Sequence, residues 1–159
     1  MKQMEVSKWL KAITVLTGIA GLFFFFLVMP VMAHDIAVMY PEAAYLLWPG
    51  MIYGWGIGVI CYAILWQFWK VCVEIGRDNS FSAENARAFA VISRLAVCMA
   101  VVWFAGVVFL ALVHALGPAF GIFMILIAFI CIVVAVLSAA LSHLVYKSYE
   151  MRRENELTI

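Results

Sequence analysis

The residues of this sequence whose side chains could hold a ligand are two histidines and two carboxylates at one boundary of its apolar segments. They are His34, Asp35, Glu42 and His114. A histidine with carboxylates can bind a divalent metal, a histidine with the thioethers of nearby methionines suits copper(I), and two histidines can ligate a haem. Polar residues are also common at a membrane boundary, and no compact ligand spacing joins these four. We therefore predict no cofactor and keep an outer-face metal, haem or small-molecule site as the alternative.

Catalysis and transport within a membrane need ionisable groups, because only function compensates for burying them in lipid. The central parts of the apolar segments contain no Asp, Glu or Lys. The four cysteines have no CxxC spacing, and the sequence has no phosphate-binding loop and no pair of Gly/Pro-broken helices. The sequence therefore predicts a protein that is not an enzyme, and a transport component is kept as a further alternative.

The composition indicates that most of the chain lies in lipid, since 68% of its 159 residues are hydrophobic and 12% are charged. Four apolar segments, at about 12–33, 44–69, 88–114 and 120–146, are each long enough for a helix that crosses a bilayer. Backbone groups in lipid must be hydrogen-bonded within their own segment, which favours helices. The predicted fold is therefore all-α, with residues 1–159 forming one integral membrane bundle of four transmembrane helices.

The distribution of basic residues predicts the orientation of these helices. All ten Lys and Arg residues lie before the first segment, between or just inside the second and third, or after the fourth. The connections at about 34–43 and 115–119 contain none, and their charges are Asp35 and Glu42. The positive-inside rule then places both termini and the middle loop in the cytoplasm. Without a basic tract of the nucleic-acid type, we expect the chain to contact the bilayer and not nucleic acid.

Three glycines in the second segment, Gly50, Gly54 and Gly58, recur every four residues. This spacing aligns them on one helix face, where a second backbone can approach closely. We predict that this face packs inside the bundle. A contact between two copies of the chain, and hence a homo-oligomer, is the alternative.

The loop before the third segment carries signals for the start of a helix. The hydroxyl of Ser82 can accept from the free N–H groups of the first turn, and Glu84 then places a negative charge where the helix dipole favours it. Phe81 can pack as a hydrophobic staple on the helix that follows. Arg94, further into the third segment, is predicted to extend toward the headgroups, with an ion pair to Glu74 or Glu84 as the alternative.

Three short motifs and the four segments resemble one known family. The motifs are Tyr40–Leu46 (YPEAAYL), Asn79–Asn85 (NSFSAEN) and Glu154–Ile159 (ENELTI). The chain resembles the YoaS-like bacterial membrane proteins of unknown function. The resemblance implies a bacterial cytoplasmic membrane and a four-helix bundle, and it transfers no catalytic residue. Members are often encoded beside small helix-turn-helix regulators, which implies a membrane-bound sensor or a sequestering partner for such a regulator.

These features predict a regulatory or scaffold protein that contacts a cytoplasmic protein through its middle loop and its C-terminal tail. The tail can dock in a groove or pair with a sheet edge, or it can simply end as a frayed helix. The predicted contact residues are Ser82, Glu84, Arg87, Glu154, Asn155, Leu157 and Ile159.

Overall fold

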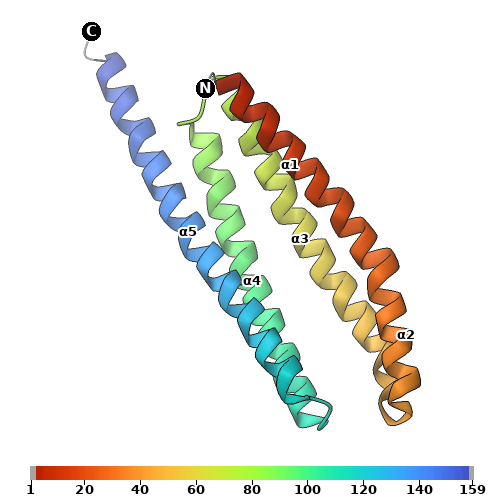
Figure 1. Cartoon of the computed structure of the whole chain (residues 1–159). Helices are drawn as coiled ribbons and strands as arrows, with labels where there is room; N and C mark the ends of the chain where they lie inside the picture. Colours follow the sequence, from red (N-terminus) through yellow and green to blue (C-terminus); the bar gives the residue numbers. More distant parts are fainter. Residues whose placement is uncertain (1–2, 158–159) are drawn as a thin grey trace.

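The computed structural model describes residues 3–157, and helices account for nearly all of them (Figure 1). The chain begins with α1 (Gln3–Phe23), the π-helical segment η1 (Phe24–Val28), α2 (Met29–Met39) and the 3-10 segment η2 (Pro41–Leu46). It continues with α3 (Leu47–Gly76), α4 (Ala83–Leu112) and α5 (Pro118–Leu157). The first membrane-length helix therefore comprises α1, η1 and α2.

Four helical stretches of the described chain are long and apolar enough to cross a membrane. They are Met4–Met39, Pro41–Gly76, Ala83–Leu112 and Phe120–Asn155. The prediction of an all-α fold with four such helices is confirmed. The third of these helices, α4, ends at Leu112, close to the approximate end predicted for the third span, and the chain turns at the next two residues.

The helices contact one another in the order of the chain. α1 and α2 pack on α3, α3 packs on α4, and α4 packs on α5, whereas α5 contacts no other helix of the described chain. In Figure 1, α4 and α5 lie close together near their connecting loop and separate toward the C-terminus. The arrangement is an open row of helices in which the first and last do not meet.

Hydrogen bonds from side-chain hydroxyls to backbone carbonyls join neighbouring helices at every step of this row. The donor–acceptor pairs are Ser7–Cys72 (2.7 Å), Tyr62–Gly18 (2.5 Å), Tyr53–Val102 (2.8 Å), Ser93–Ala135 (2.8 Å) and Ser142–Ala86 (2.7 Å). Lipid gives little hydrophobic drive for helix association, so close packing and such polar contacts carry more of it. Each bond contributes on the order of 0.6 kcal/mol in a membrane.

The π-helical segment η1 has an identifiable cause in the sequence. The N–H of Met29 bonds to the carbonyl of Phe24, five residues back, and in the same pattern Pro30 would face the carbonyl of Phe25. Proline has no N–H to donate, so that carbonyl needs another partner. The indole Nε1 of Trp55 donates to it at 3.3 Å. The bulge thus fixes a contact between the first helix and α3.

The three glycines of α3 differ in what faces them. A Cβ on Gly54 would lie 3.2 Å from the terminal methyl of Met29, and one on Gly58 would lie 3.4 Å from the ring of Phe25. Both positions therefore lie against the first membrane-length helix, inside the molecule. Gly50 is exposed and has no such neighbour within 4 Å, so the structure gives it no packing contact.

Candidate functional site

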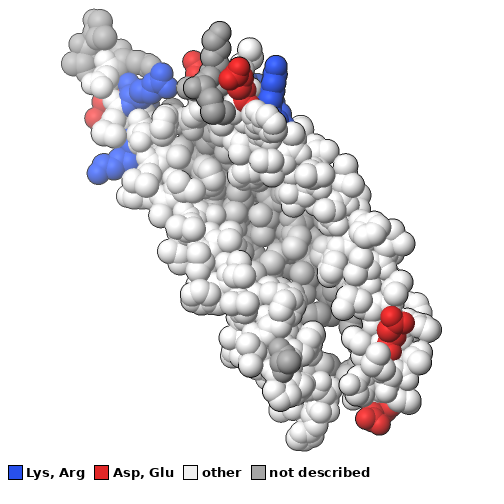
Figure 2. Space-filling view, viewed as in Figure 1, with Lys and Arg blue, Asp and Glu red and all other residues white. Residues whose placement is uncertain are grey.

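Charged side chains lie at the two ends of the molecule, and the surface between them carries almost none (Figure 2). The basic groups gather at the end where both termini lie, which we call the basic end. It comprises the start of α1, the loop 77–82 and the last turns of α5. At the opposite end the visible charges are acidic and lie over α2 and η2, which carry Asp35 and Glu42. The one-sided charge pattern of the sequence is thus also a spatial one.

The loop 77–82 is closed at its α3 side by a Schellman motif. The N–H of Asn79 bonds to the carbonyl of Glu74 (3.1 Å), and the N–H of Asp78 bonds to that of Ile75 (3.2 Å). Asp78 adopts a left-handed conformation, with φ 63°. The Glu74 carboxylate accepts from Arg77 Nη1 and from Asn79 Nδ2, each at 3.0 Å. The carboxylate therefore organises the loop, and its ion pair is with Arg77, not with Arg94.

The α4 side of the loop is fixed from within by Ser82 and Asn85. The hydroxyl of Ser82 accepts from the N–H of Asn85 at 3.1 Å, which confirms the predicted N-cap. Asn85 is 1% exposed, and its Nδ2 donates to the carbonyls of Ser80 (2.9 Å) and Asn79 (3.4 Å). Its Oδ1 has no hydrogen-bond partner in the described part of the chain. Asn85 is the organising residue that the sequence analysis missed.

The predicted contact residues in the loop and α4 occupy different environments. Ser82 is buried at 2% exposure, so its side chain serves the helix cap and not the surface. Glu84 and Arg87 are exposed on the first turns of α4. Phe81 is 51% exposed, so the predicted hydrophobic staple is only partly covered by its neighbours. The loop thus presents one aromatic ring on a well-ordered backbone.

The predicted contact residues of the tail lie at the end of a continuous helix. Glu154 and Asn155 are exposed, and α5 extends through Leu157. The backbone is therefore helical up to that residue and does not form the extended segment that pairing with a sheet edge requires. Ile159 lies outside the described residues.

The loop and α5 border a common hollow at the basic end. Its volume is about 370 Å³, and it is lined by Asp78, Ser80, Phe81 and Arg152. An aromatic ring and a guanidinium beside one hollow are the residue types enriched at protein–protein interfaces. Two segments that are far apart in the sequence thus form one surface, which we call the Phe81 hollow.

The predicted metal ligands at the other end do not converge. His34 and Asp35 lie on α2 and Glu42 on η2, and both elements pack near α3, whereas His114 lies in the α4–α5 connection. Within residues 3–157, no group of three His, Cys, Asp or Glu side chains lies close enough to hold a metal. The four residues therefore do not form one cluster in the described part of the chain, and an outer-face site stays a prediction.

His114 has a structural role in its own turn. It adopts a left-handed conformation, with φ 54°, and its N–H bonds to the carbonyl of Ala111 (3.1 Å). The N–H of Ala115 bonds to that of Leu110 (3.0 Å), which completes a second Schellman motif. This turn ends α4 two residues before the predicted boundary.

Four long apolar helices, with most charged side chains gathered at the two ends of the molecule, define a multi-span helical membrane protein. A family model described as "Protein of unknown function (DUF2975)" matches residues 31–159, and the chain belongs to this family. It is 30% identical over 153 residues to the "Uncharacterized membrane protein YoaS" of Bacillus subtilis (strain 168). That similarity covers 95% of this chain and 96% of the relative, and it confirms the resemblance inferred from the three motifs. No solved structure matches the chain.

Proposed function

We propose that the chain is a non-enzymatic protein of the bacterial cytoplasmic membrane whose basic end binds a cytoplasmic regulatory protein. The orientation in this proposal rests on the distribution of the ten basic residues in the sequence, none of which lies in the connections at about 34–43 and 115–119. Cytoplasmic loops carry such an excess of Lys and Arg because they resist translocation. Both termini and the loop 77–82 are then accessible to soluble proteins of the cytoplasm.

The observation that carries the proposal is the Phe81 hollow. Its aromatic ring can enter an apolar pocket of a partner, while Arg152 and Asp78 supply charges at the rim. The loop is held by the Ser82 cap, the Asn85 amide and the Glu74 carboxylate before any partner arrives. Association therefore requires little ordering of the loop, which lowers its entropic cost.

The partner class that we propose is a small helix-turn-helix regulator, as the YoaS-like resemblance implies. Such a protein would be held at the membrane and kept from its DNA. This role needs no catalytic group, in keeping with spans whose centres lack Asp, Glu and Lys.

The test is photocrosslinking in living cells with a photoreactive phenylalanine analogue. One variant carries the analogue at Phe81, and the matched control carries it at Tyr45, an aromatic residue of η2 at the opposite end that is 64% exposed. We expect an adduct with a soluble DNA-binding protein from position 81 alone. Identical adducts from both positions, or none from position 81, would contradict the proposal.

A charge substitution sharpens this test. Arg152→Glu alters the lining of the hollow and is expected to reduce the Phe81 adduct strongly. Arg153→Glu changes the same charge on the next residue of α5, which does not line the hollow, and is expected to leave the adduct intact. Equal losses in the two variants would show that general charge at this end, and not the hollow, attracts the partner.

A further inference from the structure

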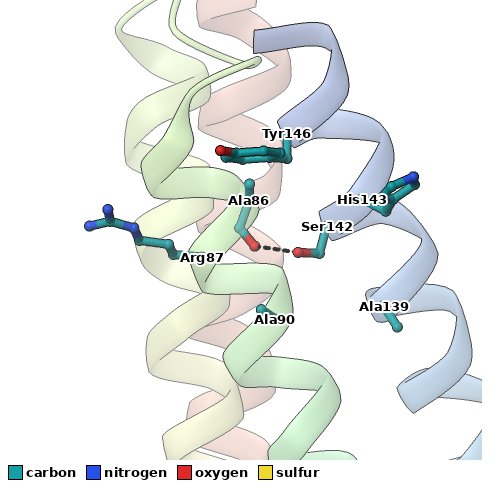
Figure 3. Close-up of a pocket in the computed structure, with 7 residues that line it drawn as sticks. All are labelled: Ala86, Arg87, Ala90, Ala139, Ser142, His143 and Tyr146. Atoms are coloured by element: carbon teal, nitrogen blue, oxygen red, sulfur yellow. Dashed lines mark hydrogen bonds between the residues drawn. The ribbon is translucent and has the colours of Figure 1, made fainter. Parts of the chain in front are cut away.

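A second surface of the molecule, separate from the Phe81 hollow, lies between α4 and α5 where the two helices begin to separate (Figure 3). It is a groove of about 310 Å³ whose lining residues belong to the membrane-length helices α4 and α5. Its inner walls carry the small side chains of Ala86, Ala90 and Ala139. The hydroxyl of Ser142 bonds to the carbonyl of Ala86 (2.7 Å) and holds the walls together.

Polar side chains border the groove on the side nearer the basic end. In Figure 3 the ring of Tyr146 extends from α5 toward Ala86 of α4, above the Ser142 bond. Arg87 extends outward from the α4 wall, and His143 extends outward from the α5 wall. The groove therefore has an apolar floor and a polar, basic rim, which is the division of polarity found in a phospholipid.

The α4 face beside the groove carries a second guanidinium. Arg94 follows Arg87 by seven residues, which is about 20° short of two full helical turns, so both lie on one face. Both are exposed, and neither forms an ion pair with a carboxylate of the described chain. Arg94 lies within the membrane-length helix, where a charge without a counter-ion is costly. A guanidinium stays charged, so it needs an anionic partner at this level.

We propose that this groove is a binding site for one anionic glycerophospholipid of the leaflet at the basic end. The phosphate diester accepts from Arg87 and from Arg94, whose long side chain extends toward the headgroup level. The phenol of Tyr146 supplies a further donor at the rim, and an acyl chain lies over Ala90 and Ala139. Lipid occupancy also removes the empty volume that the separation of α4 and α5 would leave. Basic pockets between membrane helices are a general mode of anionic lipid binding.

The choice of lipid over a soluble anion follows from the position of the groove. Its floor is apolar and lies beside the membrane-length parts of α4 and α5, so a ligand must supply hydrocarbon as well as phosphate. The choice of an anionic over a zwitterionic lipid follows from the two unpaired guanidinium groups. A zwitterionic headgroup would bring its own cation next to them.

Native mass spectrometry of the purified full chain tests the proposal, with phosphatidylglycerol, cardiolipin and phosphatidylcholine added as separate probes. We expect phosphatidylglycerol and cardiolipin to remain bound where phosphatidylcholine does not, and an excess of inorganic phosphate not to displace them. The Arg87→Gln/Arg94→Gln variant should lose affinity for them by about thirtyfold, since each basic group contributes about a factor of five to six. The Arg152→Gln/Arg153→Gln variant removes two charges elsewhere at this end and should change affinity less than twofold.

Equal losses in these two variants would overturn the proposal, because they would mean that net charge alone attracts the lipid. Equal retention of all three lipids, or displacement by inorganic phosphate, would also overturn it. An Ala139→Leu variant keeps every charge and fills the groove, and it is expected to lose the bound lipid at least tenfold. If this variant retained the lipid, the lipid would bind outside the groove and the proposal would be wrong. This outcome does not depend on whether the arginine variants fold.

Discussion

Tyr53 of α3 and Gly106 of α4 form one fitted contact, because the missing side chain of the glycine leaves the space that the phenol occupies. The hydroxyl of Tyr53 donates to the carbonyl of Val102, one turn before Gly106, at 2.8 Å. A Cβ on Gly106 would lie 2.9 Å from Cζ of Tyr53 and 3.3 Å from the terminal methyl of Met124. The position thus serves the α3–α4 and α4–α5 contacts at once.

Gly106→Ala should therefore destabilise the protein, since the tyrosine can make room only by giving up its hydrogen bond. We expect a loss of about 1–3 kcal/mol, as for other overpacked positions. Gly50→Ala is the matched control, because nothing lies within 4 Å of its added methyl group and alanine favours the helix by about 0.5–1 kcal/mol. The change in the free energy of unfolding, measured in detergent by circular dichroism, should have opposite signs for the two variants. The same sign for both would refute the packing role of Gly106.

The stability of the protein should also change in opposite directions when each of the two histidines at the end opposite the basic end is replaced by glycine. His114 has φ 54°, a conformation that glycine adopts without strain, so His114→Gly is expected to stabilise the protein by about 1 kcal/mol. His34 lies inside α2, where glycine costs about 0.8–1 kcal/mol relative to alanine, so His34→Gly is expected to destabilise it. The measurement is the unfolding midpoint in detergent. Destabilisation by His114→Gly would contradict the assignment of backbone strain to the left-handed turn at this position.

The sequence predicts the spans well because their signal is physical and local. Lipid demands long apolar helices, so the stretches around Pro41–Gly76 and Phe120–Asn155 are visible from hydrophobicity alone. The Ser82 cap is also predictable, because a cap depends on a residue and on the backbone immediately after it. The family follows from short motifs that the relative in Bacillus subtilis supports.

Features that depend on contacts between distant residues are not predictable in this way. In the sequence, Asn85 is an ordinary polar residue of the first helical turn. Only the folded loop shows that its amide donates a hydrogen bond to the carbonyl of Ser80. The left-handed turns at Asp78 and His114 lack the glycine that usually marks a Schellman motif. The Phe81 hollow joins a loop to Arg152 of α5, and no local pattern links those segments.

Asn85 provides a test of how rigid the loop 77–82 is. Its amide donates to two backbone carbonyls at almost complete burial, and a carboxylate at the same place cannot donate to them. Asn85→Asp should therefore destabilise the loop by about 2–4 kcal/mol, and Asn85→Ala by about 1–3 kcal/mol. The rate of amide hydrogen exchange in residues 77–82 should rise in both variants, and it should rise more in Asn85→Asp than in Asn85→Ala.

The solvent-facing neighbour Glu84 supplies the control for this loop. Its side chain is exposed on the same turn, so Glu84→Gln should cost less than about 1 kcal/mol, the size of a helix-dipole contribution. If Asn85→Asp and Glu84→Gln changed the exchange of the loop equally, the buried amide would not be what holds it.

The orientation of the chain can be measured directly with single cysteines on a background in which the four native cysteines are replaced by alanine. Asp35→Cys and Arg77→Cys place exposed thiols at opposite ends of the molecule. Because segments rich in Lys and Arg are retained in the cytoplasm, a membrane-impermeant maleimide should label Asp35→Cys in intact cells and Arg77→Cys only after lysis. Glu42→Cys should behave like the first variant and Arg153→Cys like the second. Labelling of Arg77→Cys in intact cells would place the Phe81 hollow outside the cell, and the proposed cytoplasmic partner would then have no access to it.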